Sequence, residues 1–375
     1  MKVVIAPNTF KNALPAGDVA DALREGILQS GFKGKVACCP VGDGGDGTGK
    51  ILRQHLNAKF GECNVVDALQ RPLETGFGLT PDRSTAIIEM ADASGLRLLG
   101  PRDYHPLIAN TRGTGMLIKA AINAGVQNII LCIGGSATVD GGTGMMRELG
   151  VVFRNDSGGE ITDLPLGLAD LKSIDITNLD ERLRDVNIQI LCDVKNKLLG
   201  ENGAAAVFGP QKGANEYDVK FLDECLTTLN HVVFATTGKR MNEMPHAGAA
   251  GGVAAALCAF CNAEAVDGIT HFLSIINFDE EMNDADLVIT GEGAIDRQTL
   301  EGKAPYGVAV AAKKFDIPVI AVAGKIEEDA ELKKYFRELI NINEPGAPLE
   351  EAIRNTKQNL VKAGEGIGKW LLSIS

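Results

Sequence analysis

A glycine-rich stretch near the N-terminus, VGDGGDGTGKIL at residues 41–52, holds residues whose types and spacing could do chemistry. Its glycines fit the dinucleotide fingerprint G-x-G-x-x-G. Its Gly-Lys pair also fits the P-loop pattern, except that Ile51 has no hydroxyl for Mg²⁺. Asp43 and Asp46 lie among the glycines, and two carboxylates repel a pyrophosphate unless a cation lies between them. The stretch therefore predicts an acidic loop suited to a metal or a polyhydroxy substrate. The alternative is a tight turn whose aspartates cap the next helix.

Three further glycine-rich loops follow, at residues 132–145, 246–257 and 290–305. Backbone N–H groups of the first could form an anion nest that leads into a helix, and the second offers another glycine-rich helix start. The third follows an apolar run and supplies two carboxylates and a lysine: Glu292, Asp296 and Lys303. Phosphoryl transfer requires Mg²⁺ ligands and a cation for the moving group. Four such loops in one acidic chain indicate a small-molecule phosphotransferase.

The composition is typical of a globular protein with two domains. The chain has 375 residues, of which 45% are hydrophobic and 23% charged, and its net charge is −12. An acidic balance argues against nucleic acid or an anionic membrane as the main partner. No apolar run approaches the roughly 20 residues that span a bilayer. The N-terminus lacks a signal-peptide pattern, so we expect a cytoplasmic protein.

The eight cysteines indicate reduced thiols rather than a disulfide framework. Cys258 and Cys261 form a C-x-x-C within the apolar run AALCAFCNA, with no second pair and no nearby histidine. We therefore expect buried structural thiols and no zinc site.

The two ends of the chain predict one parallel sheet. Apolar runs of strand length lie at the start, in residues 2–7 and 35–41, with a helix over 18–29 between them. Three more occur near the end, and each precedes a predicted helix: 286–293, 317–324 and 338–342. Five such strands fit a flavodoxin-like, doubly wound α/β domain interrupted by an insertion. The alternative is two sequential domains divided near residue 240.

The middle of the chain predicts a second, mixed α/β domain. Runs at 60–68 and 84–92 read as strands without helices between them, which favours antiparallel or mixed pairing. Two more buried strands are expected at 128–135 and 188–194, with helices at 114–123 and 217–234. We expect the first domain to comprise 1–60 with 280–375 and the insertion to comprise 61–279, to within about 20 residues.

The chain resembles the bacterial type-I glycerate kinases along its whole length. The resemblance lies in APNTFK (6–11), PVGDGGDGT (40–48), TRGTG (111–115), GGSATVDGG (134–142), CDVKN (192–196), FGPQKGA (208–214), GAAGG (248–252) and TGEGAIDRQTLEGKAPYGVA (290–309). It implies ATP-dependent, Mg²⁺-dependent phosphorylation of D-glycerate on the 2-hydroxyl, which gives 2-phospho-D-glycerate. It also implies a flavodoxin-like domain with an inserted α/β domain, and a site in the cleft between the two.

The chain departs from the family pattern at several positions. The family's PDSFK has Asn8 and Thr9 here, its RGTGEL has Met116, and its CDVxNPL has Lys197 in place of proline. Its GDGGEG has Asp46. Asn8 matters most, because an amide cannot bind a metal or accept a proton as an aspartate does.

Candidate roles follow from what phosphoryl transfer needs. Lys11 and Lys303 are expected to neutralise phosphate, with Lys212 as a third candidate. Arg112 suits the carboxylate of glycerate, because guanidinium binds carboxylate in a bidentate manner. Its alternative is an ordinary helix-start arginine paired with a surface acid.

Asp193 ends the apolar run IQILCD and is expected either to take the proton of the 2-hydroxyl or to be a structural acid. Ser136 and Thr138 are expected to contact phosphate or substrate hydroxyls, or else to cap helices. Asp43 and Asp46 are assigned to substrate, and the pair Glu292 and Asp296 to Mg²⁺. Glycines assigned to nucleotide binding are Gly134, Gly135, Gly141, Gly251 and Gly291.

Other functions remain open at this level. A non-catalytic sensor of an anionic metabolite is favoured by Asn8 and Met116, and a kinase for another short hydroxy acid is a further alternative. A nicotinamide-dependent reductase rests only on the fingerprint in 41–52. A hydrolase is disfavoured, because the five histidines are scattered and no G-x-S-x-G occurs.

Overall fold

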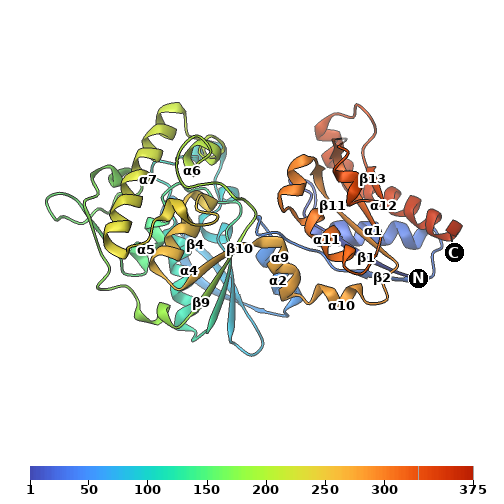
Figure 1. The fold of residues 1–375 in the computed structure, drawn as a ribbon, viewed down its shortest axis with the longest axis horizontal. Helices are drawn as coiled ribbons and strands as arrows, with labels where there is room; N and C mark the ends of the chain where they lie inside the picture. The colour runs from blue at the N-terminus through green and yellow to red at the C-terminus, as the bar shows by residue number, and fades with distance from the viewer. Residues whose placement is uncertain (328, 375) are drawn as a thin grey trace. The chain divides into compact units, whose positions relative to one another are not determined.

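A computed structural model describes residues 1–327 and 329–374, and the chain divides into two units (Figure 1). Unit 1 comprises Met1–Asp43 and Asp267–Ser375, and unit 2 comprises Gly44–Val266. The sequence had suggested boundaries near residues 60 and 280. The difference at the first boundary arises because helix α2 (Thr48–His55) packs against a strand of unit 2, β5 (Thr85–Glu89).

Within the described residues, unit 1 contains a five-stranded sheet in the order β13-β12-β11-β1-β2, and its neighbouring strands pair in parallel. The strands are β1 (Lys2–Pro7), β2 (Lys35–Cys38), β11 (Leu287–Ile295), β12 (Val319–Ile326) and β13 (Glu338–Asn341). Numbered within this unit, the order is 2-1-3-4-5, which is the flavodoxin-like arrangement. The predicted fold class is therefore confirmed. Continuous apolar runs suit these strands because helices cover both faces of the sheet.

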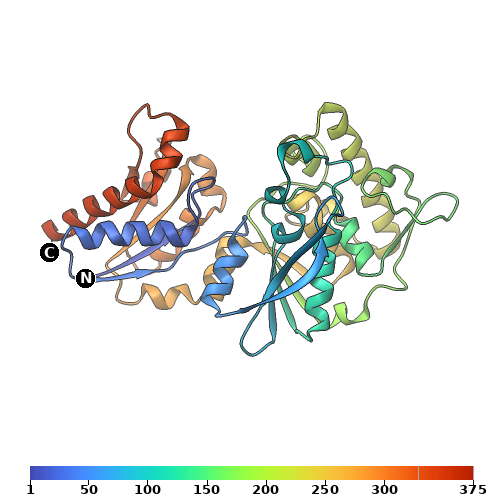
Figure 2. The same ribbon diagram turned by 180° about the vertical axis from the view of Figure 1, so that it is seen from behind.

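The α-helices in the described part of unit 1 are α1 (Ala16–Gln29), α9 (Gly268–Ile275), α10 (Phe278–Met282), α11 (Ala304–Lys313) and α12 (Leu349–Ile374). α1 and α12 lie side by side on one face, as Figure 2 shows, and α11 packs against β11 on the other. Gly26 permits the close crossing of α1 and α12, because a Cβ there would collide with the carbonyl oxygen of Val361.

The prediction of a helix between β12 and β13 is wrong. In the described residues of this connection the only helical element is a 3-10 turn, Leu332–Lys334. Leu332 and Phe336 are its buried apolar residues. Two such residues do not form the apolar stripe that holds a longer helix against a sheet.

Unit 2 is built on a mixed sheet, which has six strands in the described part of the chain, in the order β10-β9-β6-β5-β4-β3. The strands are β3 (Lys59–Val66), β4 (Pro72–Leu79), β5, β6 (Asn128–Cys132), β9 (Asn187–Cys192) and β10 (Ala263–Asp267). β3, β4 and β5 pair antiparallel, whereas β5, β6 and β9 pair in parallel. The expected mixed region is confirmed, although β4 was not predicted from the sequence. A separate pair joins β7 (Val152–Arg154) to β8 (Ser173–Asp175).

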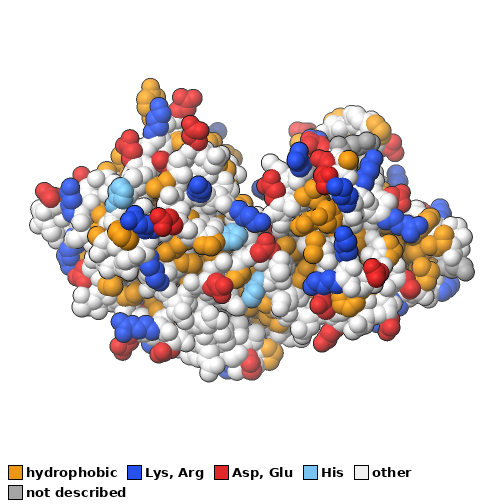
Figure 3. All heavy atoms as spheres, in the orientation of Figure 1, with side chains coloured by type: hydrophobic (Ala, Val, Ile, Leu, Met, Phe, Trp, Pro, Cys, Tyr) orange, Lys and Arg blue, Asp and Glu red, His pale blue; other side chains and the backbone are white. Residues whose placement is uncertain are grey.

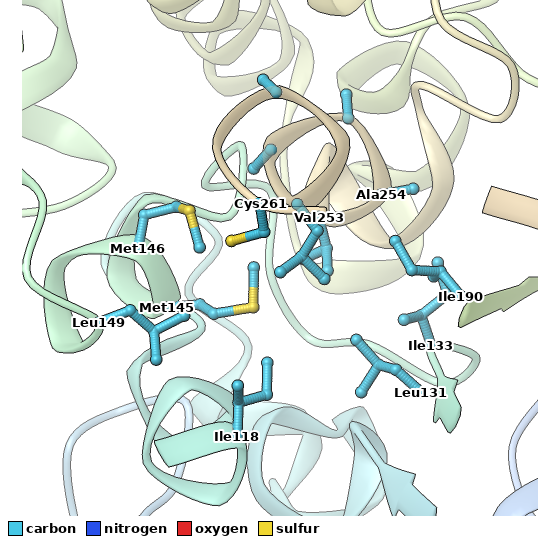
Figure 4. Close-up of a cluster of buried hydrophobic side chains, with 14 of the residues drawn as sticks. Ile118, Leu131, Ile133, Met145, Met146, Leu149, Ile190, Val253, Ala254 and Cys261 are labelled. Atoms are coloured by element: carbon cyan, nitrogen blue, oxygen red, sulfur yellow. The ribbon is translucent and has the colours of Figure 1, made fainter. Parts of the chain in front are cut away.

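The helices of unit 2 are α2, α3 (Ala91–Ser94), α4 (Arg112–Asn123), α5 (Thr143–Glu148), α6 (Ala204–Phe208), α7 (Glu216–Thr237) and α8 (Val253–Phe260). Figure 4 shows part of their core, where Cys261 lies among Met145, Met146 and Val253. Burial raises the pKa of the Cys261 thiol to about 12. Cys261 is therefore buried as predicted, whereas Cys258 is only partly buried; the eight cysteines, all of which lie in the described residues, are free thiols.

Acidic and basic side chains are interspersed over the visible face of each unit (Figure 3). Within the described residues, no helix combines the length and apolar character required to span a bilayer.

Candidate active site

In unit 1, the carboxyl ends of β1 and β11 lie next to each other, because the two strands pair in parallel register. Asn8 follows β1, and its N–H donates to the carbonyl oxygen of Gly291 at 2.8 Å. Its side-chain Nδ2 donates to Oδ2 of Asp43 at 3.0 Å. The same oxygen accepts the N–H of Ala304 at 3.3 Å. Asp43 therefore lies at the N-terminus of α11, where the helix dipole favours a carboxylate.

Glu292 is a buried acid on β11, with 8% of its surface exposed. Burial raises its pKa to about 7; Lys303 opposes this shift, and Asp43 adds to it. Oε1 of Glu292 accepts the hydroxyl of Thr299 at 3.1 Å. Asp296 caps the following turn by accepting the N–H groups of Gln298 and Thr299, at 2.8 and 3.3 Å. Thr299 thus links the two carboxylates that the sequence had assigned to Mg²⁺.

The two lysines predicted for unit 1 border these acids. The backbone of Lys11 passes close to Gly293 of β11, and its side chain is exposed. Lys303 is the N-cap residue of α11. Gly291 has a structural reason to lack a side chain, because a Cβ there would collide with the carbonyl oxygen of Val322. Unit 1 therefore brings together Lys11, Asp43, Glu292, Asp296 and Lys303.

The carboxylates of unit 1 can be compared with the ligands that Mg²⁺ requires. No group of three or more His, Cys, Asp or Glu side chains is placed to hold a metal in residues 1–327 and 329–374. Mg²⁺ in kinases is bound by one or two carboxylates together with substrate phosphates and water. Glu292 and Asp296 fit that smaller requirement.

In unit 2, the glycine loop 44–49 is anchored by a buried acid, Glu89, at the end of β5. The Glu89 carboxylate accepts the N–H groups of Gly47 and Gly49, at 2.9 and 2.7 Å. A carboxylate therefore occupies the start of α2, where a phosphate-binding loop would present its own N–H groups. The loop thus has a physical reason not to be a nucleotide site, in agreement with the sequence argument against both phosphate-binding patterns.

Burial raises the pKa of Glu89 to about 7; Asp46 and Asp92 add to the shift, and the bonds from Gly47 and Gly49 oppose it. Glu89 was not among the residues predicted from the sequence. The signal was present, because Glu89 ends the apolar run TAIIE just as Asp193 ends IQILCD.

The same loop packs closely on the neighbouring strand ends. The N–H of Gly134, just after β6, donates to the carbonyl oxygen of Gly44 at 2.9 Å. A Cβ on Gly134 would collide with the backbone of Gly45, and one on Gly44 would lie 2.6 Å from the carbonyl oxygen of Leu191 in β9. Only glycine allows this contact, so the loop lies over the carboxyl ends of β5, β6 and β9.

Asp46 does not cap α2, contrary to the alternative considered from the sequence. Its Oδ1 accepts Nε of Arg97 at 3.2 Å, and Arg97 also pairs with Asp92. Gly135 has a positive φ of 71° and lies against the Asp46 side chain. The acid is therefore held in an exposed pair beside the loop that follows β6.

The loop after β6 is organised by Asp140, whose side chain is wholly buried. It accepts the N–H and hydroxyl of Thr111 at 2.9 and 2.7 Å, and the N–H groups of Gly142 and Gly144 at 3.1 and 3.0 Å. Burial raises its pKa, and these bonds oppose the shift. Asp140 therefore joins the starts of α4 and α5.

Arg112 is the first residue of α4. Its Nε donates to Oε2 of Glu148 at 3.1 Å, and its Nη1 donates to Gln70 at 3.4 Å. In this structure the guanidinium therefore pairs with an acid of α5. This matches the alternative in which Arg112 is a helix-start arginine paired with an acid of the protein.

Ser136 and Thr138 lie in the loop after β6, and neither is a helix N-cap residue. Lys212 reaches them from another part of unit 2, and its Nζ donates to Oγ of Ser136 at 2.8 Å and to the carbonyl oxygen of Thr138 at 2.7 Å. Only 2% of the Lys212 surface is exposed, so the predicted third phosphate ligand lies behind the loop.

Asp193 immediately follows β9 and is exposed. The carbonyl oxygen of the next residue, Val194, lies 2.6 Å from Nδ1 of His246, which ties this segment to the glycine loop 246–257. That loop in turn meets the loop after β6, because the N–H of Gly141 donates to the carbonyl oxygen of Gly251 at 2.9 Å. Unit 2 thus places Asp46, Ser136, Thr138 and Asp193 at the carboxyl edge of its parallel strands.

Comparison with known proteins places the chain in a family. The model of the glycerate kinase family matches residues 3–372. The chain is 42% identical to the glycerate kinase of Bacillus subtilis over 370 residues, which are 98% of this chain and 97% of the relative. It is 40% identical to the glycerate 2-kinase of Escherichia coli over 377 residues, covering 99% and 98% of the two chains. A crystal structure from Salmonella typhimurium LT2, assigned to glycerate kinase 2, matches with a TM-score of 0.85 and 39% identity, covering 100% of this chain and 98% of the other. The chain therefore belongs to the glycerate kinase family.

Proposed function

We propose that this protein is an ATP-dependent kinase that phosphorylates D-glycerate on its 2-hydroxyl and forms 2-phospho-D-glycerate. The observation that carries the proposal is the family match, which extends over residues 3–372 and so includes both clusters of site residues. The position of transfer is supported by the name of the Escherichia coli relative, a glycerate 2-kinase.

For unit 1 we propose the groups that bind phosphate. Lys11 and Lys303 neutralise charge on the moving phosphoryl group, which kinases achieve by placing cations around it. Glu292 and Asp296 would hold Mg²⁺, which when bound neutralises charge on the phosphates of ATP. Asp43, whose carboxylate accepts the N–H of Ala304 at the start of α11, is proposed to bind the substrate. The grouping of these side chains around β11 supports the assignment.

For unit 2 we propose the groups that bind and activate glycerate. Asp193 accepts the proton of the 2-hydroxyl, a role suited to an exposed carboxylate at the end of a parallel strand. Ser136, Thr138 and Asp46 bind the substrate from the neighbouring loops, and Arg112 binds its carboxylate after exchanging its bond to Glu148 for the ligand.

The glycines assigned to nucleotide binding keep that assignment as a proposal: Gly134, Gly135, Gly141, Gly251 and Gly291. Close backbone packing accounts for Gly134, Gly251 and Gly291 in the structure. A packing requirement and a nearby ligand are compatible, because a loop without side chains also lets a ligand approach its backbone.

We also propose a cytoplasmic location. The thiols support it, since no disulfide joins the eight cysteines, all of which lie in the described residues. Such cysteine usage is typical of a reducing compartment.

The test is an ADP-release assay with the purified protein, ATP and Mg²⁺ across a panel of short hydroxy acids. We expect turnover of roughly 1–100 s⁻¹ with D-glycerate, and phosphorus NMR of the product should show the phosphate on carbon 2. ATP binding without ADP release from any acid would replace the proposal with a sensor. Turnover with a different acid alone would keep the kinase and change its substrate.

A further inference from the structure

Lys212 is an enclosed cation in the interior of unit 2, with 2% of its surface exposed. Its ammonium donates to a hydroxyl and a carbonyl oxygen, those of Ser136 and Thr138, and lies 6.0 Å from the centre of the Phe208 ring. Among the described residues no carboxylate forms an ion pair with it. Burying such a charge costs free energy unless it is compensated, so a neutral residue would be favoured here if Lys212 only filled space.

The ammonium determines how Ser136 can bond. A serine hydroxyl has one hydrogen to donate and two lone pairs that accept, whereas an ammonium can only donate. Because Nζ of Lys212 donates to Oγ, the hydrogen of Ser136 must point to another acceptor. Ser136 retains 8% exposure as a residue, and its hydroxyl, which accepts from Lys212, is held as a donor toward any further partner.

We propose that Lys212 is a positioning residue that orients the hydroxyl of Ser136 to donate a hydrogen bond to an oxygen of the bound substrate. The inference rests on the proposed function, in which Ser136 binds D-glycerate. Lys212 does not touch the substrate and acts through Ser136.

The protonation of Lys212 provides a specific signature. Burial lowers its pKa to about 7, and the charge of Asp140 opposes that shift. The other groups against Nζ, namely Ser136, Thr138 and the Phe208 ring, do not titrate near this pH. Below pH 7 the ammonium can only donate. Above it, the neutral amine has a lone pair that accepts the hydrogen of Ser136, and the hydroxyl turns away from the substrate.

The experiment compares Lys212→Met, Ser136→Ala and the double variant, with Lys220→Met as the control because Lys220 is an exposed lysine of α7. We expect KM for D-glycerate to rise about tenfold in either single variant, as for loss of one hydrogen bond to a charged group, with kcat little changed. The double variant should resemble either single variant, since both changes remove the same interaction. Lys220→Met should match the wild type.

The pH profile is the second readout. KM of the wild type should rise between pH 6 and 8.5, and KM of Lys212→Met should stay level over that range. If Lys212→Met does not fold, the rise must disappear in Ser136→Ala, and its persistence there would overturn the inference. A wild-type KM in Lys212→Met, or effects of the two changes that multiply, would do the same.

Failure of the two proposals can be told apart. A wild-type protein that forms no ADP with D-glycerate defeats the proposed function. An active wild type whose KM is unaffected by Lys212→Met defeats only the role of Lys212.

Discussion

The carboxylate of Glu89 accepts the backbone N–H of Gly49 at 2.7 Å, across 40 residues of sequence. The loop nearly satisfies two phosphate-binding patterns, but its N–H groups at Gly47 and Gly49 already bind a carboxylate of the same chain. The bond from Gly49 and the one from Gly47 anchor the loop 44–49 to Glu89. Asp46, which is proposed to bind the substrate, lies in the same loop.

Removing this anchor should destabilise unit 2. Glu89→Ala leaves the buried N–H of Gly49 and the partly buried N–H of Gly47 without their acceptor, which should lower the free energy of unfolding by about 2–4 kcal/mol. Urea denaturation measures the change. Glu62→Ala, at an exposed site on β3, is the control and should stay within about 0.5 kcal/mol of the wild type. Equal stability of the two variants would show that the anchor contributes nothing.

Glu89 should also make stability depend on pH. Its folded pKa of about 7 lies above the ordinary value of 4.5, so its stabilising contribution is complete below pH 4.5 and is lost as the pH rises through 7. Relative to Glu89→Gln, which cannot titrate, the wild type should lose about 3 kcal/mol of stability between pH 4.5 and 7. Denaturation at several pH values gives the difference, and a constant difference would mean that Glu89 keeps an ordinary pKa.

Asn8 should prevent a clash between like charges. Asn8→Asp would place a second carboxylate about 3 Å from Oδ2 of Asp43, where two negative charges repel. We expect a lower melting temperature without metal and recovery with millimolar Mg²⁺, which a carboxylate pair can bind. Asn8→Ala is the control, because it removes the amide without adding charge and should show no response to Mg²⁺. A melting temperature of Asn8→Asp that ignores Mg²⁺ would count against a cation at this position.

Glu292 should govern the response to metal. Glu292→Gln retains an oxygen that accepts the Thr299 hydroxyl, so the fold should persist. The Mg²⁺ concentration for half-maximal activity should rise by about 10-fold or more. Steady-state kinetics at varied Mg²⁺ measure it, with the exposed Glu301→Gln as the control. An unchanged metal requirement would remove Glu292 from the metal site.

Asp193 should act in the chemical step. Asp193→Asn keeps the shape of the side chain, so kcat should fall by about 10²–10⁴ while KM changes little. Because Asp193 is exposed, the melting temperature should stay close to that of the wild type. Asp185→Asn, also exposed in unit 2, is the control. A lower melting temperature with near-normal kcat in the folded fraction would instead identify a structural acid.

Much of the fold could be read from local pattern. The run KVVIAP coincides with β1, and the strands at both ends of the chain form the flavodoxin-like order that their spacing predicted. The central strands β1, β11 and β12 are largely buried apolar runs, which is typical of strands covered on both faces. The edge strands β2 and β13 are only partly buried. β4 was missed because PLETGFGL starts with Pro72 and contains two glycines, which are rare in strands.

The candidate residues were likewise found where a short stretch of sequence has an unusual combination of residue types. Acids after apolar runs and glycines around aspartates are visible in any linear stretch, and they led to Asp43, Asp193 and Glu292. The family resemblance rests on the same short motifs. The sequence by itself therefore determined the strands, the loops at their carboxyl ends and the family.

Only the tertiary structure decided which partners these residues have. Lys212 meets Ser136 across 76 residues, and Asp43 meets the start of α11 across 261. Lys212 was expected to bind phosphate and instead lies behind Ser136, because burial depends on which loops gather at one edge of a sheet. Hydrogen bonds between such loops form only after distant strands have paired, so no periodicity within a single segment encodes them.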